Sequence, residues 1–457
     1  MGLFRNDLST SILKSKTGMS GVGILLCLIL VSIFTMVFVP LDTYKQWNNP
    51  SSWTSFPKSA LPSWVNTFLV KKIPEHQLLE NTQTTIQTDD NTRKIIQNFE
   101  MDYTYDYFPN DFIYQYTVEY LGTPVLEFDV IRPDGATLHL LSYSLPDLKS
   151  NTAYSDKVYS DKVFSTNESI RKNILLESDR FAFSIDNMPS EEVIFSKFNA
   201  HEVLKGKYTF VTKISTTDTR SAIHDSKLIV GGKVFGLIGT DDQRRDLAIG
   251  LLWGTPLALF IGITVSVASV VSGLIYGVFA GYKGGKTDES MMRFNDIIYA
   301  LPALPFLIIL SVTISNSIFL MIGFLMIFGW VGIAKVSRSM ALQIKNRQFV
   351  EASRTMGQKS SKIIFKHIIP QIMPYALASI AISVPAAITT EAGLSFLGLG
   401  DPSFPTWGQI LHDASTHGAV TRGLWWWVIP PGIMISLTGL AFVFVGNSLD
   451  RLSRIKR

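Results

Sequence analysis

The segment EASRTMGQKSSKIIFKHIIP, residues 351–370, is polar and basic, yet strongly apolar stretches of chain flank it on both sides. Gly357 divides it into two arms of about 10 residues, too short and too charged to cross a bilayer, which needs about 20 apolar residues in a helix. The segment therefore predicts a helical elbow outside the membrane, joining two spans of a membrane protein.

The composition agrees with residence in a membrane. Of the 457 residues, 47% are hydrophobic and 17% are charged, whereas soluble globular proteins carry about 25% charged residues. The single cysteine, Cys27, excludes a disulfide within the chain and a cysteine-based zinc site. Because it lies in an apolar run, we expect Cys27 to be a small buried apolar residue.

Six apolar stretches predict membrane spans, and Pro302 and Pro305 predict a kink in the third of them. The first is interpreted as a retained anchor rather than a cleaved signal peptide, because it is long for a signal core and no small-residue cleavage pattern precedes Pro40. The predicted spans are Gly21–Val39, Leu247–Tyr282, Asp296–Ile314, Ile318–Ile333, Ile368–Thr390 and Val428–Leu449.

The orientation follows from four clusters of basic residues, which six spans place on one side of the membrane. Lys and Arg are enriched in cytoplasmic loops, so both termini, the elbow and this side are predicted to be cytoplasmic. Trp425, Trp426 and Trp427 then lie where the last span enters from outside, as an interfacial anchor would. The basic clusters are Arg5 with Lys14 and Lys16, residues 283–293, residues 335–366 and residues 451–457.

Residues 41–246 separate the first two spans and are predicted to be extracytoplasmic. They hold 22 Lys and Arg against 28 Asp and Glu, a net of −6, which leaves +10 for the rest of the chain. The basic excess therefore belongs to the membrane part and indicates contact with membrane lipid and the positive-inside pattern, not nucleic acid. This insert is long enough to bury its own core.

The insert is predicted to be a strand-rich α+β domain. Alternating apolar residues around Pro133–Gly135 favour a hairpin, and KYTFVTKI and KLIVGGKVFGLIG favour further strands, whereas Leu78–Gln97 is read as a helix or a linker. Asn167 begins a weak glycosylation tripeptide. Four histidines lack metal-ligand spacing and are interpreted as solvated or structural: His76, His139, His201 and His224. No enzyme motif is found in the insert.

Small residues mark one face of the second span. Gly273, Gly277 and Gly281 recur every fourth residue, which allows another helix to approach closely. A seam that slides during transport and static packing both remain open. Asp296 and Glu391 are the acids nearest to membrane depth, and we interpret them as structural, with water or Arg293 as their partners.

Within the elbow, QFVEASRTM predicts a short helix with one narrow apolar face formed by Phe349, Ala352 and Met356. Glu351 and Arg354 lie beside this face, and Gly357 is suited to end the helix. Ser360 or Ser361 is expected to cap a second helix that starts near Lys362. A helix lying on the lipid surface is the alternative, but Ala352 and Ser353 favour docking into a protein groove.

The elbow resembles the EAA loop of ABC importer permeases, in which Glu-Ala-Ala, three residues and Gly precede an Ile-x-Leu-Pro ending. Glu351, Ala352 and Gly357 match, Ser353 replaces the second Ala, and the ending reads HIIP. The motifs GTDDQRRD (239–246), AGYKGGKTDE (280–289) and EAGLSFLGLGDPSFPTWGQIL (391–411) are similar to the dipeptide and oligopeptide (DppC/OppC-like) branch. Arg244 stands where that branch has a glycine, which leaves the conformation of its loop open.

The resemblance covers the first anchor and residues 239–457, but not residues 41–238. It implies an all-α, six-span permease core of the type I importer kind, with domains at 1–40, 41–246 and 247–457 and a coupling loop at 346–370. Its implied partners are a second permease subunit, two ATPases and an external substrate-binding protein. The residues implied to couple to the ATPase are Glu351, Ala352, Ser353, Arg354, Met356 and Gly357.

No GxxxxGK[ST] phosphate loop occurs in the chain, so it is not expected to be an enzyme or to hold a cofactor; ATP and Mg would bind to the partner ATPases. Di- or oligopeptides are the first expectation for the cargo, with oligosaccharides and then nickel as alternatives. A membrane-anchored sensor or binding receptor is the rival from another class, but it predicts a cytoplasmic output module, and only loops and a short tail face inward.

Overall fold

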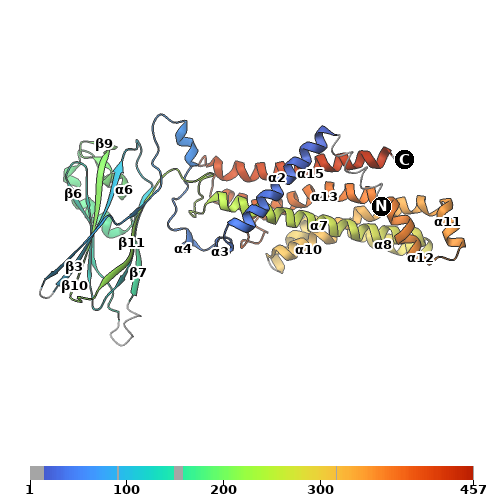
Figure 1. Ribbon diagram of the computed structural model, residues 1–457, viewed down its shortest axis with the longest axis horizontal. Coiled ribbons are helices and arrows are strands. Elements are labelled where there is room, and N and C mark those ends of the chain that lie inside the picture. The colour runs from blue at the N-terminus through green and yellow to red at the C-terminus, as the bar shows by residue number, and fades with distance from the viewer. Residues whose placement is uncertain (1–14, 90–91, 149–157, 315, 456–457) are drawn as a thin grey trace. The chain divides into compact units, whose positions relative to one another are not determined.

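The computed structural model describes residues 15–89, 92–148, 158–314 and 316–455. Arg5 and Lys14 of the predicted N-terminal cluster, and Lys456 and Arg457 of the tail, lie outside these ranges. The chain forms two compact units: Met1–Asn49 with Ala248–Arg457 is helical, and Pro50–Leu247 is rich in strands (Figure 1).

The helical unit is built from long apolar helices with short connections. The long helices are α2 (Lys16–Phe38), α7 (Leu247–Lys283), α10 (Ile318–Lys345), α13 (Ile369–Phe396) and α15 (Trp425–Ile455). The shorter ones are α3 (Leu41–Lys45), α8 (Gly285–Ala300), α9 (Ala303–Thr313), α11 (Gln348–Thr355), α12 (Ser360–Ile363), the π-helical turn η4 (Ile364–Ile368) and α14 (Trp407–Thr416). Helix α15 packs against both α13 and α2.

Five helices of the described residues are long and apolar enough to cross a membrane, or six if the bent pair α8–α9 counts as one span. The predicted kink is present and sharp, because α8 and α9 meet at 74° across Leu301 and Pro302. Proline disfavours helical backbone at the residue before it, and Leu301 is correspondingly extended, with ψ of 129°. The third predicted span is therefore a broken helix.

One expectation for the helical unit is wrong, and another holds only in part. Cys27 is exposed on α2, on a helix whose apolar residues are mostly exposed as well, as suits a surface that faces lipid rather than a protein core. Of the three consecutive tryptophans, only Trp425 is exposed, whereas Trp426 and Trp427 are buried. Helix α14 packs against α15, and the His417 ring lies 5.7 Å from that of Trp427, so the protein itself covers this part of the predicted anchor.

The insert is a sandwich of two antiparallel sheets. One has the order β1-β11-β4-β7, with strands Gln77–Glu80, Ala222–Gly231, Asp111–Glu119 and Val158–Phe164. The other has the order β2-β3-β10-β5-β6, with strands Gln83–Asp89, Thr92–Tyr103, Gly206–Thr216, Val125–Ile131 and Thr137–Ser144. Small elements complete it: α4 (Pro50–Trp53), η1 (Ser63–Thr67), α5 (Glu168–Leu176), η3 (Ser178–Arg180), α6 (Ser190–Ile194), β8 (Ser196–Lys197) and β9 (Ala200–Val203).

Aromatic side chains from both sheets form one core. Phe112 of β4 lies 6.2 Å from Phe128 of β5 and 5.9 Å from Phe210 of β10, ring centre to ring centre. The hairpin predicted at Pro133–Gly135 is confirmed by the pairing of β5 with β6. The strand-rich character of the insert is confirmed too, since nine of its strands lie in these two sheets.

The interpretation of Leu78–Gln97 as a helix or a linker is wrong. This stretch forms most of β1, all of β2 and half of β3. Strand β2 is the edge of its sheet, and the described side chains between Gln83 and Thr88 are exposed, so the stretch lacks the apolar alternation that marks a half-buried strand. Its pairing with β3, not its own composition, makes it a strand.

The histidines of the insert lie apart, and three of them contact an acidic side chain: His139 with Asp129, His201 with Glu192 and His224 with Glu119. Among the described residues, no group of three or more His, Cys, Asp or Glu could hold a metal ion. Asn167 is exposed and caps α5, because its side-chain oxygen accepts the backbone amide of Ser169 at 2.9 Å. This contact gives the asparagine a local structural role.

Arg244 adopts a backbone conformation that suits glycine. Its φ is 68°, in the left-handed region that costs other residues about 1–2 kcal/mol. Its guanidinium donates to the Phe56 carbonyl at 2.8 Å and pairs with the Asp111 carboxylate. These contacts within the insert unit compensate the strain, so the substitution keeps a glycine-like backbone and adds a tie to β4.

Candidate functional site

The elbow is built on α11, one face of which is fixed in the helical unit. Val350 and Ser353 are buried, and Val350 joins an apolar cluster with residues of α7, α10 and η4. The Ser353 hydroxyl donates to the Phe349 carbonyl at 2.8 Å, so its polar group is satisfied within the helix. The burial of this face holds the helix in one orientation.

The apolar residues singled out in the sequence lie on the other side of α11. Phe349, Ala352 and Met356 are exposed, Met356 by 73%, and Glu351 and Arg354 are exposed beside them. An apolar strip with charged neighbours, presented outward by a fixed helix, is suited to a protein partner. Whether these residues couple to an ATPase stays a prediction.

Gly357 ends α11 as the sequence predicts. Its φ is 74°, its amide donates to the Arg354 carbonyl at 3.0 Å, and the Gln358 amide donates to the Ser353 carbonyl at 3.2 Å. This pair of bonds is the Schellman motif, which satisfies the last carbonyls of a helix and favours glycine. A Cβ at Gly357 would meet no atom within 4 Å, so only the backbone conformation restricts this position.

The second arm differs from expectation at its start. Helix α12 begins at Ser360 with Lys359 as its N-cap, and no side chain caps it, so the predicted caps by Ser360 or Ser361 are wrong. The turn set by Gly357 already places the Lys359 carbonyl to accept the Ile363 amide at 3.1 Å. The π-helical turn η4 then precedes Pro370, where proline removes one backbone donor.

Charge on the elbow is mostly positive. Residues 346–370 contain five Lys and Arg, and Glu351 is their only acid. Across the elbow, the side-chain oxygen of Gln358 lies 3.1 Å from Nε2 of His367, which links the turn to the second arm. A partner that docks here meets a basic surface with one acidic position.

The glycines of α7 contact α10. A Cβ at Gly273 would lie 2.5 Å from the Trp330 carbonyl oxygen, and one at Gly281 would lie 2.8 Å from that of Arg338. Gly277 faces the Ala334 carbonyl still more closely. The three glycines therefore bring two backbones together within this chain, a contact that larger side chains would prevent.

Two ion pairs, missed in the sequence, join α8 to α10. Arg338 donates to both carboxylate oxygens of Asp288, at 2.6 and 2.7 Å. Lys335 pairs with Asp296 at 2.8 Å and also lies over the Tyr299 ring. Asp296 is thus held by a lysine, whereas Arg293, the expected partner, lies 3.7 Å from Glu289. The Glu289–Arg293 spacing of four residues was visible in the sequence, but the two pairs between α8 and α10, across 50 and 39 residues, were not.

Glu391 is buried to 2% exposure in α13. Its carboxylate accepts the Ser395 hydroxyl at 2.8 Å and is also hydrogen-bonded by Thr406. These bonds tie α13 to the N-cap of α14, because Thr406 also caps that helix. The contacts agree with the structural role inferred for Glu391.

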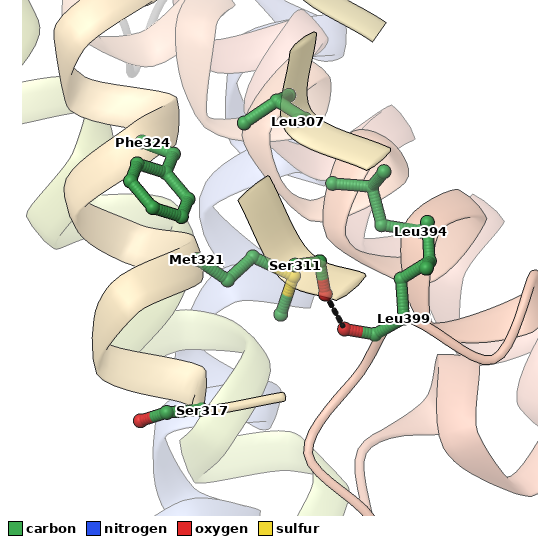
Figure 2. A pocket seen from close by; sticks show the side chains of 7 residues that line it. All are labelled: Leu307, Ser311, Ser317, Met321, Phe324, Leu394 and Leu399. Carbon is green, nitrogen blue, oxygen red and sulfur yellow. Dashed lines mark hydrogen bonds between the residues drawn. The ribbon is translucent and has the colours of Figure 1, made fainter. Parts of the chain in front are cut away.

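A small pocket lies between α9, α10 and the end of α13 (Figure 2). Its lining is apolar apart from two serines, and the Ser311 hydroxyl donates to the Leu399 carbonyl at 3.0 Å. The seven lining residues are Leu307, Ser311, Ser317, Met321, Phe324, Leu394 and Leu399.

Comparison with known proteins identifies the family to which the helical unit is similar. Residues 273–455 match the family described as binding-protein-dependent transport system inner membrane component. The oligopeptide transport system permease OppC of Bacillus subtilis is 40% identical over 212 residues, which cover 46% of this chain and 68% of that protein. This chain belongs to that family of permeases.

Two further relatives agree. The dipeptide transport system permease DppC of Bacillus subtilis is 39% identical over 46% of this chain and 66% of its own length. The OppC of Haemophilus influenzae is 37% identical over 47% of this chain and 68% of its own length. The chain is therefore a multi-pass permease component of an ABC importer, and ATP hydrolysis belongs to partner subunits.

Proposed function

We propose that this chain is one of two permease subunits of an ATP-driven importer for di- or oligopeptides. The names of the relatives reported above include the words oligopeptide and dipeptide. An external binding protein delivers the cargo, a second permease completes the pathway, and two ATPases bind ATP and Mg. Both termini lie in the cytoplasm, and residues 41–246 lie on the opposite side of a cell membrane.

The exposed strip of α11 carries the coupling part of the proposal. Phe349, Ala352 and Met356 face outward from a helix that Val350 and Ser353 fix to the spans. A groove on the ATPase receives this strip, Glu351 and Arg354 orient it, and Gly357 sets the turn. Closure of the ATPases on ATP moves the elbow, and the spans rock with it to open the pathway to the other side.

The contacts of α11 support a direct route for that motion from the elbow to the spans. Val350 lies in the cluster that contains Val278 of α7 and Ile344 of α10. The same two helices meet along Gly273, Gly277 and Gly281. A push on α11 is thereby passed to a seam in which backbones touch directly, and this close contact favours a shared movement of α7 and α10.

The cargo is tested by uptake into proteoliposomes that hold the whole complex with its binding protein. Labelled di- and oligopeptides are expected to accumulate in an ATP-dependent way, and labelled oligosaccharides and nickel are not. A complex whose ATPase carries an inactivated ATP site serves as the control for leakage. Uptake of oligosaccharide or nickel without peptide would overturn the peptide assignment but leave the permease role intact.

A further inference from the structure

A cluster of apolar side chains lies exposed on η1, on the loop that follows it and on a neighbouring turn of the insert unit. Phe68 is 81% exposed and Val70 is 97% exposed, and Trp64, Leu69 and Leu237 are exposed beside them. We call these five residues the loop patch. Exposed apolar groups that cluster in this way mark sites of contact with proteins or membranes.

Hydrogen bonds at the base of the loop keep the side chains of the loop patch exposed. The side chain of Asn66 bonds the backbone of Ile73 twice, at 2.9 and 3.0 Å, which closes the loop between them. Nζ of Lys72 also donates to the Asn66 carbonyl at 2.7 Å. The loop that carries Phe68, Leu69 and Val70 is therefore fixed at its base while its tip points into solvent.

The neighbouring turn is tied to η1. The Trp64 indole N–H donates to the Leu237 carbonyl at 2.9 Å, and the Ser63 amide donates to the Gly236 carbonyl at 2.9 Å. The Trp64 and Phe68 rings meet edge to face with centres 6.3 Å apart. The polar edge of the indole is thus satisfied by the protein, and its apolar body remains for another contact.

The loop patch lies next to the start of a predicted membrane span. The amide of Leu247, the first residue of α7, donates to the Gly239 carbonyl at 3.1 Å. Leu237 precedes Gly239 by two residues, at most about 7 Å of chain. The patch is therefore continuous with the point at which α7 begins, within the same compact unit.

We propose that the loop patch inserts into the bilayer surface where α7 enters it. Two lysines, Lys71 and Lys72, follow the apolar tip directly, and aromatic and aliphatic side chains combined with lysines favour binding to the surface of anionic membranes. The patch anchors the insert to lipid near α7. The occupant is a lipid surface with anionic headgroups, rather than a protein.

A fluorophore attached at the tip tests this in the full chain. Cys27→Ser removes the native thiol, and Val70→Cys or Phe68→Cys provides the site; both positions are exposed, so the core is unaffected. Leu176→Cys is the matched control, because Leu176 is an apolar residue on α5 that is 74% exposed. The complex is placed in nanodiscs of phosphatidylethanolamine and phosphatidylglycerol that contain lipid with a nitroxide near the top of its acyl chain.

The proposal predicts strong quenching of the label at residues 70 and 68 and little at residue 176. Lower quenching at residues 70 and 68 when phosphatidylcholine replaces the anionic lipid supports the role of the lysines. Equal quenching at all three sites would overturn the proposal. Protection of residue 70 that arises only on addition of the binding protein would also overturn it, by assigning the patch to a protein.

Discussion

The guanidinium of Arg338 in α10 donates two hydrogen bonds to the carboxylate of Asp288 in α8, at 2.6 and 2.7 Å. Asp288 is buried, and the Arg338 side chain is one-third exposed. Charge-assisted bidentate hydrogen bonds of this kind are stronger than hydrogen bonds between neutral groups. The pair connects the helix before the α8–α9 break to the helix that leads into the elbow.

Replacement of Asp288 by Asn is expected to destabilise the permease, because it leaves the guanidinium with one neutral partner. The loss should be about 1.5–3 kcal/mol, the range for hydrogen bonds to charged groups. Thermal unfolding of the purified complex in detergent measures it. Glu289→Gln is the control, since the Glu289–Arg293 pair is exposed and 3.7 Å long, and it should change little. Equal effects of both substitutions would contradict the assigned role.

Gly277→Ala is expected to disturb the contact of α7 with α10. The added methyl group would overlap the Ala334 carbonyl, which is backbone and cannot rotate away. Overpacking costs about 1–3 kcal/mol. Gly332→Ala of α10 is the matched control, since a Cβ there meets no atom within 4 Å. Thermal unfolding together with transport measures both, and a Gly277→Ala protein as stable as the control would show that the seam is looser than described.

At Gly357 the backbone conformation, not space, is predicted to matter. Gly357→Val should weaken assembly with the ATPase, because a branched residue resists a φ of 74°. Gly357→Asn should retain it, since asparagine tolerates this region. The measurement is co-purification of the ATPase with each variant. Equal recovery with Val and Asn would show that the turn geometry is irrelevant to docking.

The insert is expected to lose stability as the pH falls below about 6.5. Burial lowers the pKa of His76 from its ordinary value of 6.5, and Arg244 lowers it further, against a backbone hydrogen bond from Ser55 and the charge of Asp111. Between the lowered pKa and pH 6.5, His76 binds a proton in the unfolded chain but not in the folded one. The free energy of unfolding that is present above pH 6.5 is therefore lost on acidification.

His76→Gln should flatten this pH dependence between pH 6.5 and the lowered pKa. Hydrogen exchange of β1 and β11 in the full chain, measured across that range, reports on the insert alone. His224→Gln is the control, because His224 is half exposed and pairs with Glu119. An unchanged pH profile for His76→Gln would refute the assignment.

The sequence predicted those features that depend on local pattern or on bulk hydrophobicity. The spans, the break at Pro302, the β5–β6 hairpin and the stop at Gly357 follow from composition and turn chemistry. Strand β2 was missed because it depends on pairing with β3. Cys27 was misplaced because burial in lipid and burial in protein select the same side chains.

In the elbow, too, the features set by local sequence were predicted and those set by tertiary packing were not. Its helix and its apolar strip could be predicted, but the strip alone did not reveal which face the protein covers. Val350 and Ser353 are buried because α7, α10 and η4 come together around them, a consequence of tertiary packing. The Asp288–Arg338 pair and the strained Arg244–Asp111 tie likewise need partners that are 50 and 133 residues apart.

The exposed face of α11 is proposed to dock the ATPase. The direct test is substrate-stimulated ATP hydrolysis by the complex in proteoliposomes, with Glu351→Lys compared with Glu289→Lys, the change of another exposed acid, on α8. Loss of a docking contact of about 2 kcal/mol weakens affinity roughly 30-fold, so stimulation should vanish for Glu351→Lys and persist for Glu289→Lys. Full stimulation in both would contradict the claim.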